Sequence, residues 1–170
     1  LWKALLDDRL DVIATDHAPH TLEEKGLTRN NGMLLSLPPL AGVGGRPAYE
    51  QVHAGLPLVQ HSLLLMLYYH KQGRISLEKI AEKMSHALAD CFQIKDRGYI
   101  REGYHADLVI VDLNNPGNVS KENILYKCGW SPLEGMEFPA SITHTFVNGH
   151  LVYDNGKWDE SERGQRLRFI

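Results

Sequence analysis

The run Val12-Ile13-Ala14 is apolar throughout, and the polar residues Thr15-Asp16-His17 and then His20 follow it closely. A short, wholly apolar run is typical of a strand that is buried on both faces of a parallel sheet, which favours an α/β fold. Active sites of parallel α/β barrels lie at the carboxyl ends of the strands, where Asp16 would emerge. The alternative is that Asp16 caps the following turn and that both histidines are surface groups.

The composition limits the class of protein. The chain has 170 residues, of which 43% are hydrophobic and 23% charged, as in an ordinary globular domain. A net charge of -3 gives no basic surface for nucleic acid. The most apolar run, Leu63 to Tyr69, is too short to span a membrane. Cys91 and Cys128 are too few for a disulfide scaffold, which favours the cytoplasm.

The first half of the chain predicts helices around an irregular stretch. Residues 1–20 predict a helix, a turn and the apolar strand. Residues 21–57 contain many Gly, Pro and Asn and predict a long irregular segment. Residues 58–95 predict helices, with Ser76 as an N-cap before apolar residues at helical spacing over 77–88.

The second half of the chain predicts antiparallel strands. Leu108–Val111 reads as a strand, and residues 142–153 read as a hairpin. Asn148-Gly149 supplies the two positive φ angles that a tight hairpin turn requires. The segment from Lys157 is polar and predicts a peripheral tail.

Most of the other ionisable or nucleophilic side chains have ordinary structural interpretations. Lys25 would pair with Glu23 or Glu24, and Cys91 would lie in the core. The remaining histidines would pack or face solvent; these are His53, His61, His70, His86, His105, His144 and His150.

The segment Ala14–Lys25 resembles the second signature of the dihydroorotases, which are amidohydrolase-superfamily enzymes of pyrimidine synthesis. The resemblance continues through the helix at residues 74–92 and the strand region at residues 98–111 to about residue 156. It includes Ser131-Pro132-Leu133-Glu134-Gly135 and Val147-Asn148-Gly149. This class of dihydroorotase has a small β domain beside its barrel.

The resemblance implies a fold and its parts. Residues 1–95 would be the C-terminal sector of a TIM (β/α)8 barrel of the amidohydrolase type. Residues 96–156 would supply strands to the small composite β domain, and residues 157–170 would be the polar tail. The missing N-terminal barrel portion would hold most of the metal ligands, because the chain has no His-x-His pair.

The resemblance also implies residue roles. Asp16 would bind Zn²⁺, of which an intact site holds one or two, and would transfer the proton of the attacking water. His20 would bind the substrate's carboxylate, and the backbone of Ala54 and Gly55 would contact the substrate. His17 would orient the metal ligands through hydrogen bonds. A single aspartate cannot hold a catalytic zinc ion, so this chain alone would be inert.

Three functions remain open from the sequence. The first is zinc-dependent, reversible hydrolysis of dihydroorotate to N-carbamoyl-L-aspartate. The second is another cyclic amidase, a hydantoinase or allantoinase, against which His20 argues because those rings lack the carboxylate. The third is a catalytically dead scaffold subunit for a partner such as aspartate transcarbamoylase. A homodimer is compatible with each of them.

Overall fold

The computed structural model describes residues 1–30, 33–36 and 53–170. The chain divides into two units, which are described separately. Unit 1 comprises residues 1–14, 63–117 and 137–170, and unit 2 comprises residues 15–62 and 118–136. The sequence suggests divisions near residues 95 and 156 instead. Those divisions refer to the domains of an intact enzyme, and they stay a prediction.

Unit 1 begins with helices that share one apolar core. Helix α1 (Trp2–Leu6) is followed, after unit 2's first segment, by α2 (Ser62–Lys71) and by a continuous helical stretch. That stretch consists of α3 (Leu77–Ala81), the π-helical turn η3 (Glu82–His86) and α4 (Ala87–Cys91). The buried core residues are Leu5, Leu67, Ile75, Ile80 and Ala140.

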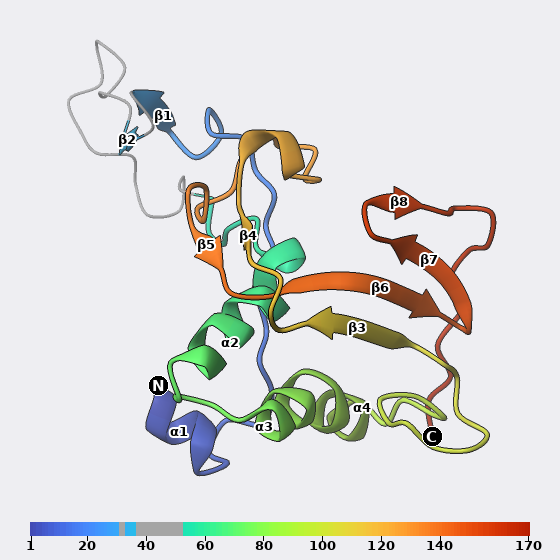
Figure 1. Ribbon diagram of the computed structural model, residues 1–170. Coiled ribbons are helices and arrows are strands. Elements are labelled where there is room, and N and C mark those ends of the chain that lie inside the picture. The colour runs from blue at the N-terminus through green and yellow to red at the C-terminus, as the bar shows by residue number, and fades with distance from the viewer. Residues whose placement is uncertain (31–32, 37–52) are drawn as a thin grey trace. The chain divides into compact units, whose positions relative to one another are not determined.

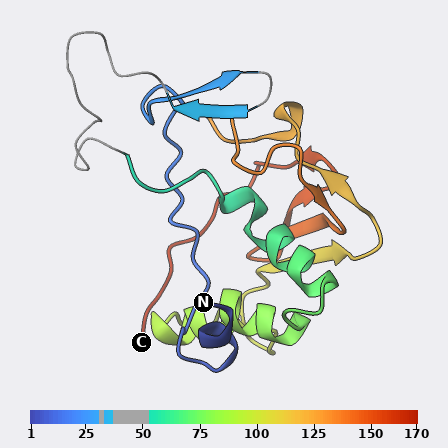
Figure 2. The ribbon, with the colours of Figure 1, turned by 90° about the vertical axis from the view of Figure 1, so that its left-hand side faces the viewer.

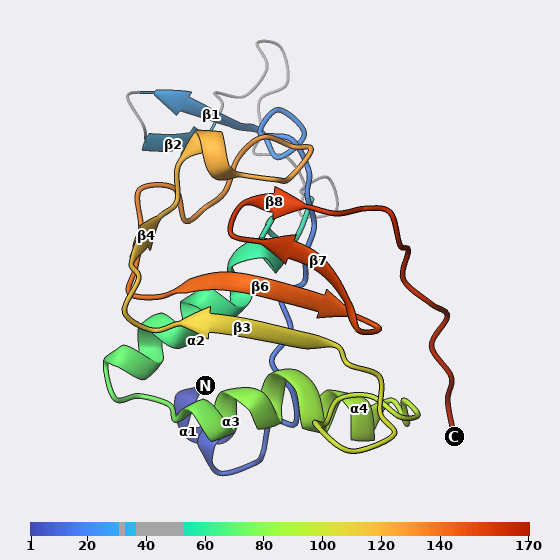
Figure 3. The same ribbon diagram turned by 45° about the vertical axis from the view of Figure 1, so that its right-hand side comes forward.

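A four-stranded antiparallel sheet completes unit 1. Its strands are β3 (Leu108–Asp112), β6 (Ser141–Val147), β7 (His150–Asp154) and β8 (Lys157–Trp158), in that order. Figure 3 shows β3 and β6 alongside the α3–α4 helical stretch, and Val111 of β3 packs against the core. The short strands β4 (Gly117–Asn118) and β5 (Glu137–Phe138) form a separate two-stranded sheet (Figure 1).

Unit 2 has little regular structure. Strands β1 (Leu27–Asn30) and β2 (Met33–Ser36) form an antiparallel pair (Figure 2). The turns η2 (Val59–His61) and η4 (Lys121–Asn123) are single 3-10 turns. The polar residues of the site described below all lie in this unit.

Several local predictions are confirmed. The Ser76 hydroxyl accepts the Lys79 N–H at 3.2 Å, as expected of an N-cap. The predicted strand at residues 108–111 is β3, and β6 and β7 form the predicted hairpin. Its turn residues have φ angles of 53° at Asn148 and 86° at Gly149.

Predictions for the N-terminal part need two corrections. Val12–Ala14 forms no strand; Ile13 instead donates its N–H to the Lys83 carbonyl at 3.0 Å. A parallel strand exists only through pairing, and the described residues supply no parallel neighbour for it. The predicted irregular segment 21–57 contains β1 and β2, while its residues 31–32 and 37–52 lie outside the described residues.

The part of the chain from residue 77 onward differs from expectation in three details. The regular helix predicted over residues 77–88 contains the π turn η3. Cys91 is exposed because it is the last residue of α4 and not part of the core. The predicted tail is exposed, but it begins with the strand β8. Near the end of the tail, the Arg168 carbonyl accepts the Lys95 N–H at 2.8 Å. No helix among the described residues is long and apolar enough to cross a membrane.

Candidate active site

The chain turns sharply at Asp16. This residue has φ +47° and is exposed, so its carboxylate faces solvent at the start of unit 2. Aspartate tolerates this left-handed conformation better than most residues because its short polar side chain can hydrogen-bond locally. The turn therefore presents at the surface the carboxylate that is predicted to be catalytic.

The loop at residues 54–58 lies directly against this turn. The Ala18 N–H donates to the Leu56 carbonyl at 3.1 Å, and His17 and Leu56 form an isolated parallel bridge. Gly55 has φ +73°, and a Cβ there would lie 2.6 Å from the Asp16 carbonyl oxygen and 3.2 Å from Asp16 Oδ2. The structure thus brings together Asp16 and Gly55, 39 positions apart, at a distance that only glycine permits.

His17 is held by the same loop. Its Nδ1 accepts the backbone N–H groups of Leu58 at 3.2 Å and Val59 at 3.3 Å. An imidazole nitrogen that accepts carries no proton, so the proton of the neutral ring is on Nε2. The ring also lies 5.2 Å from that of Tyr126. His17 therefore links the Asp16 turn by hydrogen bonds to the loop that contains Gly55.

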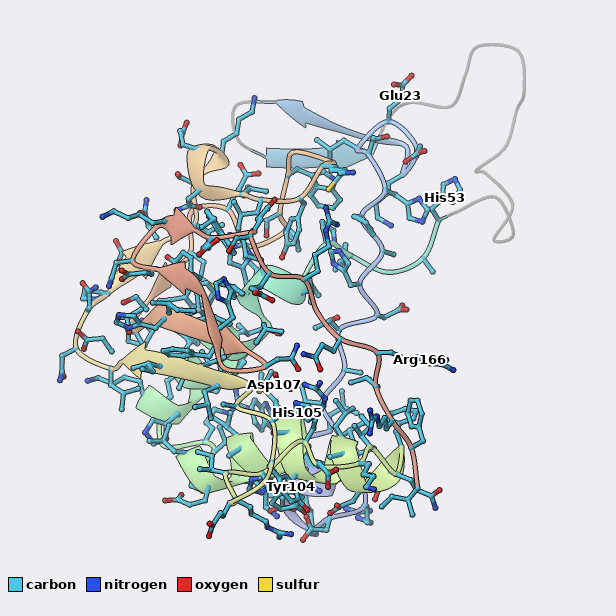
Figure 4. The ribbon with its side chains drawn as sticks, turned by 90° about the vertical axis from the view of Figure 1, so that its right-hand side faces the viewer. Glu23, His53, Tyr104, His105, Asp107 and Arg166 are labelled. Carbon is cyan, nitrogen blue, oxygen red and sulfur yellow. The ribbon has the colours of Figure 1, made fainter. Side chains whose placement is uncertain are left out.

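His20 lies between an imidazole and a carboxylate. Its ring stacks on that of His53 at 4.3 Å, and Figure 4 labels His53 at the start of the loop. Its Nδ1 is 3.7 Å from Glu24 Oε2. Thr21 donates its N–H to Glu24 Oε2 at 2.8 Å, which holds the pKa of Glu24 below its ordinary value. The His20 ring is only partly buried, so an imidazole N–H there can donate to a bound ligand.

Neighbouring side chains point elsewhere or brace the loop. Glu23 is exposed and projects outward in Figure 4. Lys25 Nζ donates to the His53 carbonyl, where the sequence suggested a pair with Glu23 or Glu24. Ala54 is exposed beside Gly55. Its predicted substrate contact stays a prediction.

The segment at residues 118–136 adds residues that the sequence did not single out. Trp130 Nε1 donates to the His20 carbonyl at 2.8 Å, and the Tyr126 hydroxyl accepts the Gln60 N–H at 2.9 Å. His61, expected to pack or to face solvent, is 3% exposed, and its Nδ1 lies 3.4 Å from the Tyr126 hydroxyl. Burial lowers the pKa of His61, which favours the neutral ring. The Ser-Pro-Leu-Glu-Gly motif, which directly follows Trp130, was the one sequence feature that pointed to this segment.

A metal ion does not fit the described residues by themselves. They contain no group of three or more His, Cys, Asp and Glu side chains that could hold one. A catalytic zinc ion takes about three protein ligands. Asp16 could provide one carboxylate, and the remaining ligands would have to come from outside the described residues.

The chain matches the model of the amidohydrolase family over residues 1–152. It is 32% identical to a dihydroorotase of Pyrococcus abyssi, across 98% of this chain and 35% of that protein. It is 29% identical to an allantoinase of Desulfitobacterium hafniense, across 99% of this chain and 33% of that protein. The chain thus spans about a third of the length of these relatives.

Solved structures agree on the fold. A D-hydantoinase from a Thermus species matches with a TM-score of 0.80 at 24% identity, over 99% of this chain and 34% of that one. An L-hydantoinase from Arthrobacter aurescens matches with a TM-score of 0.71 at 25% identity, over 92% and 32%. With the family model covering most of its length, the chain belongs to the amidohydrolase family.

Proposed function

We propose that this chain is the C-terminal part of a dihydroorotase, which reversibly hydrolyses the cyclic amide of dihydroorotate to N-carbamoyl-L-aspartate. The observation that carries the proposal is the position of His20, stacked on His53 and 3.7 Å from Glu24, on the turn that begins at Asp16. An imidazole N–H at this position can donate a hydrogen bond to a substrate carboxylate, which favours a substrate with that group. The similarity to dihydroorotases at 32% identity supports the same substrate class.

In this proposal, Asp16 transfers the proton. Its exposed carboxylate would accept a proton from the attacking water and return it to the leaving amide nitrogen. The backbone of Ala54 and Gly55 would line the substrate side of the turn. A bound zinc ion would make water more acidic, with Asp16 as one of its ligands and the others supplied from outside the described residues.

Hydantoinase or allantoinase activity is the second candidate. The allantoinase match at 29% identity and the fold similarity to hydantoinases favour it. The substrates of these enzymes lack the carboxylate of dihydroorotate, so His20 would have no anionic partner. A scaffold role beside aspartate transcarbamoylase is the third candidate, and it predicts no turnover of any cyclic amide.

Steady-state kinetics of the intact, metal-loaded enzyme tests the proposal. The substrates are dihydroorotate, N-carbamoyl-L-aspartate, hydantoin and allantoin, and the variant is His20→Ala. Loss of a charge-assisted contact should raise KM for the two carboxylated substrates about 10- to 100-fold and change turnover less. His86→Ala is the matched control, because His86 also stacks on a ring at 4.3 Å, that of Tyr99 in unit 1.

Three results would contradict the proposal. Hydantoin or allantoin as the better substrate would favour the second candidate. An equal effect of His20→Ala on all substrates would remove the carboxylate-binding role. No turnover of any substrate would favour the scaffold role.

A further inference from the structure

Trp130 is the largest fully buried side chain among the described residues, at 2% exposure. Its only polar group is the indole N–H, and this group donates to the His20 carbonyl at 2.8 Å. The two residues are 110 positions apart in the sequence. A buried indole N–H requires an acceptor, so the packing of Trp130 and the position of the His20 backbone depend on each other.

The segment around Trp130 is braced on both sides. The Gly129 N–H donates to the Tyr126 carbonyl at 2.9 Å, which closes a turn immediately before Trp130. The Ser131 N–H donates to Glu134 Oε1 at 3.2 Å immediately after it. The Tyr126 hydroxyl is in turn fixed by the Gln60 N–H. Hydrogen bonds therefore hold the chain immediately before and immediately after the indole.

The other contacts of His20 do not connect its backbone to a distant part of the chain. The ring contacts His53 and Glu24, which are both exposed. The His20 N–H bonds only two residues back, to the Ala18 carbonyl at 2.9 Å. The bond from Trp130 therefore links the His20 backbone to a buried part of unit 2 that is distant in the sequence.

We propose that Trp130 is a positioning residue that fixes the His20 backbone, and thereby sets the selectivity of the site for carboxylated cyclic amides. This inference rests on the proposed function. Trp130 would touch no substrate; it would act only through the orientation of the His20 imidazole.

Kinetics of Trp130→Phe in the intact enzyme gives the first test. Phenylalanine keeps an aromatic ring and removes the N–H. KM for dihydroorotate should rise about 2- to 10-fold, the range expected for one hydrogen bond, with turnover and the KM for an uncharged cyclic amide unchanged. Trp158→Phe is the control, since Trp158 is 56% exposed in unit 1. In a His20→Ala background, Trp130→Phe should have no further effect on KM; an equal further loss would overturn the inference.

Nuclear magnetic resonance gives a test that does not depend on activity. In the unmutated, metal-loaded enzyme, the Trp130 indole proton should exchange with solvent at least about tenfold more slowly than that of Trp158. In Trp130→Phe, the His20 ring resonances should shift while those of His86 stay in place. Equal exchange rates, or unmoved His20 resonances, would overturn the inference. Because neither readout involves a substrate, this result is distinct from a failure of the proposed function, such as hydantoin proving to be the substrate. If Trp130→Phe does not fold, the exchange measurement still decides.

Discussion

At the scale of single residues, the candidate site depends on two unusual backbone conformations. Asp16 and Gly55 both have positive φ angles, +47° and +73°, and they lie against each other. At Asp16, which is not a glycine, this conformation costs free energy and persists where the surrounding structure over-determines it, which is common at functional sites. His17 provides part of that constraint by accepting the N–H groups of Leu58 and Val59.

Asp16→Asn should separate chemistry from folding. Asparagine tolerates positive φ as well as aspartate does, so the turn should survive. The amide cannot accept a proton, so turnover of the intact enzyme should fall by about 10²- to 10⁴-fold with a smaller change in KM. Asp96→Asn is the control, because Asp96 also has a positive φ, 57°, but lies in unit 1. Turnover within about threefold of the unmutated enzyme would contradict the role of Asp16.

Gly55→Ala should damage the site more than a positive φ alone explains. A methyl group there would lie 2.6 Å from both the Asp16 carbonyl oxygen and the Ala18 Cβ. The loop must then move away from Asp16, which should lower turnover as well as the free energy of unfolding.

Gly73→Ala is the matched control for Gly55→Ala. Gly73 has φ +72°, but a Cβ there would meet nothing within 4 Å. The free energy of unfolding of this variant should fall only by the conformational cost of a positive φ, about 1–2 kcal/mol, and its turnover should not change. Denaturant unfolding and kinetics of both variants provide the measurement. Equal losses in the two variants would show that the contact with Asp16 is unimportant.

At the scale of elements, the helical stretch from α3 to α4 combines local and distant constraints. Ser76 caps its first turn, and the π turn η3 contains Lys83. The Lys83 side chain is 3% exposed, and its Nζ lies 2.9 Å from Asp8 Oδ1. The helical stretch is therefore started by its own sequence and joined by ion pairs to the segment that follows α1.

Ser76→Ala should weaken the start of α3. It removes the acceptor of the Lys79 N–H, which should lower the free energy of unfolding by about 1 kcal/mol. Ser76→Asp keeps an oxygen acceptor at the same position and should lose far less. Urea unfolding of the three proteins followed by circular dichroism gives the comparison. Equal losses for alanine and aspartate would mean that the hydroxyl does not act as a cap.

At the scale of the whole molecule, charge and apolar exposure affect the chain in different ways. Asp8 pairs with Lys79 and Lys83, which joins distant parts of unit 1. Val109 and Ile110 are 47% and 48% exposed on β3, an edge strand of its sheet. The ion pairs make stability depend on pH, whereas the open apolar edge favours association.

The acid stability should depend on Asp8. Hydrogen bonds from Lys79 and then Lys83 lower its pKa from 3.8 to about 2. Because the folded pKa is lower than the unfolded one, this contribution is present above pH 3.8 and is lost as the pH falls through about 2. Thermal melts between pH 2 and 6 should show a shallower acid decline in Asp8→Asn. The control is Asp7→Asn, whose carboxylate pairs with the nearby, exposed Arg9. Parallel declines in the Asp8→Asn and unmutated proteins would contradict the prediction.

Residues 1–170 expressed alone should self-associate. An exposed apolar edge strand is a template for pairing with another chain. Ile110→Lys should reduce the association measured by analytical ultracentrifugation. Leu125→Lys is the control, since Leu125 is 59% exposed and lies outside the strands. A monodisperse monomer of the unmutated chain, or an equal effect of both variants, would contradict edge pairing.

The sequence by itself determined the features that depend on neighbouring residues. The Ser76 cap and the Asn148-Gly149 turn are chemical preferences within a few residues, so both could be predicted before any contact was known. The Asp16-His17-Ala18-Pro19-His20 motif identified the candidate site because its residues are adjacent in the chain, and the family followed from the resemblance.

Only the tertiary structure decided the features that depend on distant partners. Val12–Ala14 has the composition of a buried strand, but a strand needs a paired neighbour and none is described. The approach of Gly55 to Asp16 and the bond from Trp130 to His20 join residues 39 and 110 positions apart. No local preference encodes such contacts, because each needs a partner that is distant in the sequence and comes close only when the chain folds.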